Sequence, residues 1–166
     1  MLTFHELMGF MSPKMANQIL EDTYAQNREV YRVLVTAVAH AQKLRPVFLE
    51  RQPRTRRHEG FVQSLSRVAM EEHAGNLIRG WLFKEHQEML STFLGALDIK
   101  HDKGMVDDVP DNLDEDKLKA AVELLVEKYP QELVAVYLTA FNASNAHRWE
   151  NLDTLLAEDP RLQLGE

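Results

Sequence analysis

The sequence predicts an all-α protein, a single-domain helical bundle of about seven helices with long helices first and a compact three-helix C-terminal part. Three observations favour this class. Apolar residues recur at spacings of three and four along most of the chain. Pro, Gly and Asn interrupt these stripes where helices would begin or end. The two strand-like segments, 29–38 and 133–138, lie far apart in sequence, and two lone strands among helices would be marginal.

The longer helices are expected in the first part of the chain. Ser12 and Pro13 have the types of an N-cap and a first helical residue, so a second helix should follow a short first one. A third is nearly apolar all round and should be central, and Pro46 should end it. Gly75 should end one helix, 60–74, before the next, 76–97, begins. The helices expected here cover 3–11, 13–26, 28–44, 60–74 and 76–97, with the second and third either separate or fused.

The three-helix C-terminal part should begin at Asp114, the expected N-cap of its first helix. Pro130 should open the next helix, Ser144 or Asn145 should cap the last, and Pro160 should follow its end. The helical pattern stops over residues 98–113, which predicts a hinge between subdomains there. A tail of this size would be marginal alone, so residues 1–166 are expected to fold as a single helical domain.

Positive charge is concentrated in one short stretch of an acidic protein. The chain has a net charge of −7, yet residues 43–58 hold six of its nineteen Lys and Arg residues against Glu50 alone. Five of the six are arginines, which bind phosphate and carboxylate groups bidentately. Pro46 and Pro53 predict a mostly exposed connection between two helices that is not helical throughout. The residues of this candidate binding patch are Arg45, Arg51, Arg54, Arg56, Arg57 and His58.

Three interpretations of the basic patch remain open from the sequence. The patch could bind an acidic protein partner, or phosphate groups and nucleic acid. It could also be structural, with arginines near a helix C-terminus and a counter-charge in the acidic segment 98–116. The sequence pI of about 5.5 disfavours nucleic acid, and only Phe48 and Phe61 could supply stacking.

The acidic segment 98–116 does not match a calcium-binding loop. It contains eight acidic residues, but starting an EF-hand pattern at Asp98 puts Lys103 where glycine is needed and Val109 where glutamate is needed. Starts at the other aspartates fail as badly. We therefore expect a solvated turn in which Gly104 has a positive φ.

The seven histidines offer a weaker alternative. His73 and His86 lie on predicted inward-facing stripes, and together with neighbouring glutamates they could form a metal-binding or acid–base site between helices. The sequence contains neither of the helical metal motifs that pair glutamate with histidine, nor a nucleophile or phosphate-loop motif. We therefore expect no cofactor, no metal and no catalytic residue.

These observations favour a non-enzymatic helical protein–protein interaction or adaptor protein. Its partner would be a protein with an acidic surface, and a homodimer is an expected arrangement. The two alternatives are a phosphate- or nucleic-acid-binding protein that uses residues 43–58, and a helical metal protein or enzyme. No apolar run reaches the length of a membrane span, and no export signal is evident, so a cytoplasmic protein is expected.

Overall fold

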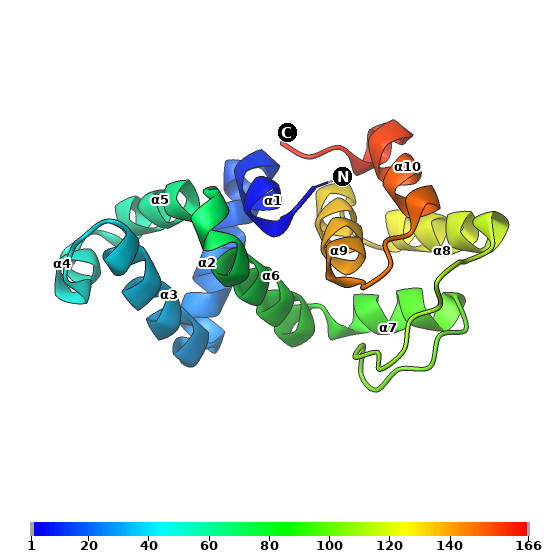
Figure 1. Ribbon diagram of the computed structural model, residues 1–166, viewed down its shortest axis with the longest axis horizontal. Coiled ribbons are helices and arrows are strands. Elements are labelled where there is room, and N and C mark those ends of the chain that lie inside the picture. Colours follow the sequence, from blue (N-terminus) through cyan, green and yellow to red (C-terminus); the bar gives the residue numbers. More distant parts are fainter. Residues whose placement is uncertain (1, 166) are drawn as a thin grey trace. The chain divides into compact units, whose positions relative to one another are not determined.

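The computed structural model describes residues 2–165 and confirms the all-α class. Over this range the chain forms ten α-helices and two short 3₁₀ helices, more than the seven expected, and no β-strand (Figure 1). None of these helices is long and apolar enough to cross a membrane. The helices that start before residue 82 are, in order, α1 (Phe4–Phe10), α2 (Pro13–Gln26), α3 (Arg28–Ala41), α4 (Pro46–Arg51), α5 (Arg54–Leu65), η1 (Val68–Met70) and α6 (Glu71–Glu85). After α6 come α7 (Gln87–Ala96), α8 (Glu115–Lys128), α9 (Gln131–Ser144), α10 (Glu150–Glu158) and η2 (Pro160–Leu162).

The chain divides into two compact units, residues 2–81 and residues 82–165 of the described chain. The division falls inside α6, whereas the expected hinge at residues 98–113 lies within the second unit. Each unit has its own set of packed helices. That residues 1–166 fold as one cooperative domain stays a prediction.

The basic stretch 43–58 is not helical throughout, as expected, but α4 and the start of α5 make up most of it, and the breaks lie at residues 43–45 and 52–53. Pro46 occupies the first turn of α4, and Pro53 is the N-cap residue of α5. Proline is tolerated in both places because the first N–H groups of a helix have no partner within it. The two prolines therefore begin helices, and α4 links the adjoining ends of α3 and α5 (Figure 1).

Two predicted boundaries in the middle of the chain are also wrong. The helix α6 runs through Gly75, where an added Cβ would come within 3.1 Å of the Phe4 ring. This glycine therefore serves close packing of α1 against α6 and ends no helix. The expected helix 76–97 is broken at His86, which has φ −127° and precedes α7.

The last helix begins about five residues later than expected because α9 continues to Ser144. Asn142 then fixes the chain between α9 and α10. Its side-chain oxygen accepts a 2.8 Å hydrogen bond from the backbone N–H of Trp149, and its nitrogen donates to the Trp149 carbonyl at 3.1 Å. Asn142 is fully buried, so these bonds satisfy its polar atoms.

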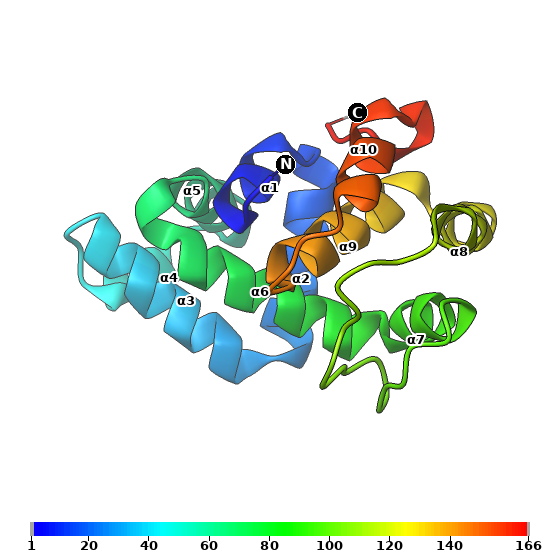
Figure 2. The ribbon, with the colours of Figure 1, turned by 45° about the vertical axis from the view of Figure 1, so that its right-hand side comes forward.

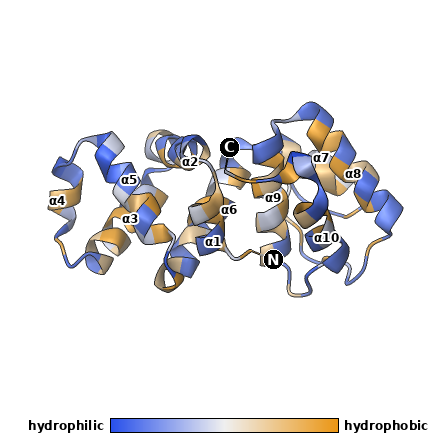
Figure 3. Ribbon diagram, turned by 90° about the horizontal axis from the view of Figure 1, so that it is seen from above, coloured by the Kyte–Doolittle hydropathy of each residue, from blue (hydrophilic) through white to orange (hydrophobic). Residues whose placement is uncertain are grey.

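Each unit buries its own apolar core. Figure 3 shows helices with one hydrophobic and one hydrophilic side, as amphipathic periodicity requires. In the first unit, Leu7, Ile19, Val38 and Leu65 are fully buried on four different helices. In the second unit α9 is buried along almost its whole length, from Leu133 to Ala140.

The acidic segment between α7 and α8 is extended and anchored at several points (Figure 2). The expected turn is confirmed at Gly104, which has φ +89° and packs against Leu90. Trp149 donates from its indole nitrogen to the Pro110 carbonyl at 2.8 Å, and Asn151 donates to the Leu113 carbonyl at 3.1 Å. The second unit therefore holds this segment in place without regular structure.

Candidate functional site

The helix α4 and the residue Leu44 before it expose several large apolar side chains. Leu49 is its one buried residue, while Phe48 is 51% exposed, Leu44 is 43% exposed and Val47 is 40% exposed. Within α4, Val47, Phe48 and Arg51 fall on one side at helical spacing, opposite Leu49, and the exposed Leu44 and Arg45 come just before the helix. We call this surface the α4 face and define it as Leu44, Arg45, Val47, Phe48 and Arg51.

The arginines of the α4 face have no internal partner. Within residues 2–165, no ion pair forms at Arg45 or Arg51, nor at the exposed Arg56 of α5. By contrast, Arg54 donates to Glu21 at 3.1 Å. Two guanidinium groups therefore flank an exposed phenyl ring without any acid to neutralise them.

Arg57 and His58, which we expected in an exposed basic patch, are buried. Arg57 is 8% exposed and His58 is 1% exposed. Both lie on the side of α5 that also buries Phe61 and Leu65, since residues four apart share a helix face. The sequence did not indicate that α5 begins at residue 54, so it did not show that residues 57 and 58 share the buried side of a helix with Phe61.

His58 belongs to a polar cluster in the first unit. Its Nε2 atom lies 2.8 Å from the Tyr31 hydroxyl, in a hydrogen bond. Its Nδ1 atom lies 3.3 Å from a Glu21 carboxylate oxygen, without the alignment of a hydrogen bond. The helices α2, α3 and α5 thus each contribute one member of a carboxylate, phenol and imidazole set.

Guanidinium groups surround the aromatic rings of this cluster. Arg28 lies 4.1 Å and Arg54 4.8 Å from the centre of the Tyr24 ring, and Arg57 lies 5.7 Å from the centre of the Tyr31 ring. Such cation–π contacts are attractive and strengthen when water is excluded. Arg28 and Arg54 also lower the pKa of Tyr24, because they favour its anionic form.

Burial determines the protonation states in the cluster. It lowers the pKa of His58 to about 4, with Arg57 and Arg54 adding to the effect and the Glu21 carboxylate opposing it. Burial also raises the pKa of Tyr31 to about 12. Both groups are therefore neutral near pH 7. Because His58 is inaccessible and its Nε2 already bonds Tyr31, the set is suited to holding three helices together.

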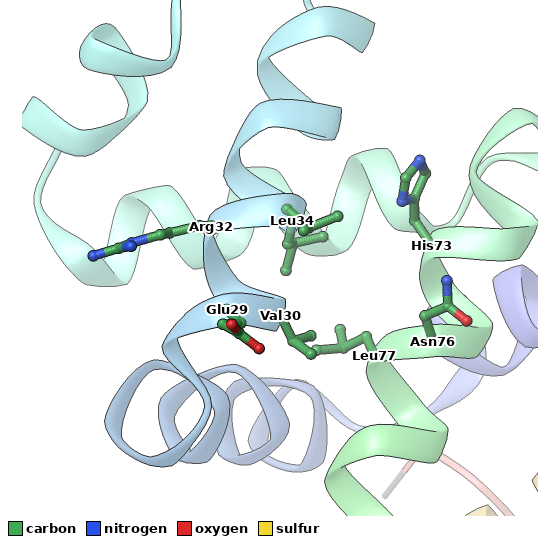
Figure 4. Close-up of a pocket in the computed structure, with 8 residues that line it drawn as sticks. Glu29, Val30, Arg32, Leu34, His73, Asn76 and Leu77 are labelled. Carbon is green, nitrogen blue, oxygen red and sulfur yellow. The ribbon is translucent and has the colours of Figure 1, made fainter.

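A groove of about 510 Å³ lies between α3 and α6 in the first unit (Figure 4). Val30 and Leu34 of α3 and Leu77 of α6 form its apolar part, and Arg32 points away from it. His73 and Asn76 are on the α6 side. The groove contains a single imidazole and one carboxylate, that of Glu29, which is not a set of ligands typical of metal sites.

The two histidines of the metal alternative lie in different units. His73 borders the groove of the first unit, and His86 is at the junction of α6 and α7 in the second. Over the part of the chain that the structure describes, no three His, Asp or Glu side chains group closely enough to hold a metal ion. The absence of a metal requirement stays a prediction.

Comparison of the chain with known protein-family models, with curated protein sequences and with solved structures gives no match. No relative therefore supplies a function for this fold.

Sequence reasoning located the arginines of the α4 face but missed its apolar half. The signal was present, because Val47, Phe48 and Arg51 have the spacing of one helix side. The polar cluster around His58 had no such signal. Its members come from three helices that only the folded chain brings together.

Proposed function

We propose that this protein is a non-enzymatic interaction protein of the cytoplasm that binds an acidic protein segment through the α4 face. The observation that carries the proposal is Phe48, a half-exposed phenyl ring between two arginines without acidic partners. Large exposed apolar groups rimmed by polar residues are typical of interaction sites. Aromatic and arginine side chains are also the residues that dominate binding energy at protein interfaces.

The composition of the face favours a protein partner over nucleic acid. The whole protein carries a net charge of −7, which repels a polyanion at long range. Phe48 is the single aromatic ring of the face, whereas single-stranded nucleic acid is bound on several stacking rings. A short protein segment with both acidic and apolar side chains matches the guanidinium groups and the apolar residues together.

The test compares capture of partners from native cytoplasm by three variants. One carries Arg45→Ser, Arg51→Ser and Arg56→Ser, and one carries Phe48→Ser. The control carries Lys14→Ser, Arg67→Ser and Lys84→Ser, which removes the same charge from exposed positions elsewhere. Proteins and nucleic acids retained by each are identified by mass spectrometry and sequencing, at low and at physiological salt.

We expect an acidic protein that the wild type and the control capture and that both face variants lose. The loss on removing the arginines should be clearest at low salt, where screening is weakest. Equal capture by all variants would refute a role for the α4 face. Retention of nucleic acid that depends on the three arginines but not on Phe48 would favour the phosphate-binding alternative instead.

A further inference from the structure

We propose that a partner of the α4 face is a second copy of this chain, bound through its acidic segment 98–116. The inference rests on the proposed function, because it uses the same face and names the partner. It joins two surfaces of opposite charge that belong to one sequence. Each of them also exposes apolar surface, from Leu44, Val47 and Phe48 on the α4 face and from Met105 on the segment.

The charges of the two surfaces are opposite in sign and similar in size. Residues 43–58 hold six basic side chains against one acid, and residues 98–116 hold eight acids against two lysines. Much of the negative charge of the acidic segment is unpaired, and so is the positive charge of the α4 face. Within the described range Asp107, Asp108 and Asp116 form no ion pair, whereas Asp98 is bound to Lys117 at 2.7 Å.

Met105 gives the acidic segment an apolar contact point. It is 64% exposed, among the most exposed large apolar side chains described. The turn that carries it is ordered, since Asp102 and Met105 exchange two backbone hydrogen bonds of 2.9 Å. The Gly104 N–H also donates to the His101 ring at 3.1 Å. Methionine adapts its shape to aromatic rings, so Met105 suits contact with Phe48.

The contact must join unlike surfaces. Two α4 faces would repel each other through Arg45 and Arg51, and two acidic segments would repel each other in the same way. An association of the α4 face of one copy with the acidic segment of another leaves the first copy with an unused segment and the second with an unused face. If these two also meet, the pair closes as a two-fold dimer, and if each meets a further copy, rings or open chains form.

Two variants that each lose one surface test the proposal. The face variant carries Arg45→Glu, Phe48→Ser and Arg51→Glu. The segment variant carries Met105→Ser, Asp107→Lys and Asp108→Lys. All changes are at exposed positions, and circular dichroism and thermal unfolding establish that both variants fold. A control with Lys14→Glu and Arg67→Glu changes the charge of the first unit outside the face.

Sedimentation velocity at low and at high salt, over a range of concentrations, measures the association. We expect the wild type and the control to form dimers or larger multimers whose share rises with concentration and that dissociate at high salt. Each variant alone should associate about a hundredfold more weakly, since like charges across an interface cost several kcal/mol. An equimolar mixture of the two variants should form a heterodimer and no larger species, because one working surface of each kind remains.

A wild-type protein that stays monomeric at low salt and high concentration would overturn the inference. So would a mixture of folded variants that contains no heterodimer although the wild type associates. Neither result would contradict the proposed function, which concerns capture of a partner through the same face. That proposal fails separately, when capture of a partner from cytoplasm does not depend on Phe48.

Discussion

The two units each contain an aromatic cluster, and the clusters differ in what surrounds them. In the first unit, the ring centres of Tyr31 and His58 lie 5.7 Å apart, and in the second those of Phe93 and Tyr137 lie 5.6 Å apart. The first cluster is bordered by guanidinium groups and a carboxylate. The second continues through Phe141 to the buried Trp149. The two clusters therefore have similar ring spacing but different surroundings, polar and charged in the first unit and aromatic in the second.

The hydroxyl groups show the difference most clearly. The Tyr31 hydroxyl bonds His58, whereas the Tyr137 hydroxyl is buried with no hydrogen-bond partner among the described residues. Burial raises the pKa of both, so both remain neutral at ordinary pH. The first cluster should respond to pH and to loss of polar atoms. The second should respond to loss of volume.

The largest effect is expected from removing volume in the second cluster. Phe93→Ala should lower the free energy of unfolding by about 3–5 kcal/mol, because Phe93 is fully buried and a cavity would remain. Phe83→Ala, at a 36% exposed ring, should cost much less and serves as the control. Urea unfolding at neutral pH measures both. A loss below about 1 kcal/mol for Phe93→Ala, far under the range for core phenylalanines, would mean that Phe93 is not buried in solution.

The first cluster should make stability depend on pH. Burial lowers the pKa of folded His58 from its ordinary value of 6.5 to about 4, so folding excludes a proton that the unfolded chain binds. The stabilisation is complete above about pH 6.5 and falls as pH decreases toward 4, by about 3 kcal/mol in total. Unfolding of wild type and His58→Gln across this range gives the difference between them. If the free energy of unfolding falls in parallel for the two proteins as pH decreases, protonation of His58 does not destabilise the folded state.

A matched pair of substitutions compares the two hydroxyl groups directly. Tyr31→Phe should cost about 1–2 kcal/mol, since it leaves the buried Nε2 atom of His58 without its partner. Tyr137→Phe should be neutral or slightly stabilising, because it removes a buried hydroxyl that has no partner. Thermal unfolding of the wild type and of both variants measures these two changes in stability. Equal costs would indicate that Tyr137 has a polar partner in solution.

The smallest effect is expected on the surface of the first unit. Arg45→Ser, Arg51→Ser and Arg56→Ser together should change the free energy of unfolding by no more than about 1 kcal/mol, because these exposed arginines make no ion pair in the described chain. Arg57→Ser should destabilise more, since it removes a buried side chain that contacts two tyrosine rings. Similar midpoints for Arg57→Ser and the triple variant would contradict the assignment of a buried role to Arg57.

The local sequence predicted the elements that have strong start signals. Ser12 caps α2 through a 3.1 Å bond from the Met15 N–H, and Asp114 precedes α8, as expected. Gly104 has the positive φ that its turn requires. These features depend on residues within a few positions of one another. Propensity and capping act over that distance, so the sequence alone determined them.

Tertiary structure decided which side of each element is buried and where helices stop. Gly75 lies within a helix because Phe4, more than seventy residues away, packs against it. Arg57 and His58 are buried because α5 turns them toward Tyr31 of another helix, while Arg54 and Arg56 stay exposed. Phe48 is exposed because α4 buries Leu49 instead. The charges and apolar residues were evident from the sequence, but which of them face solvent depends on the packing of helices distant in sequence.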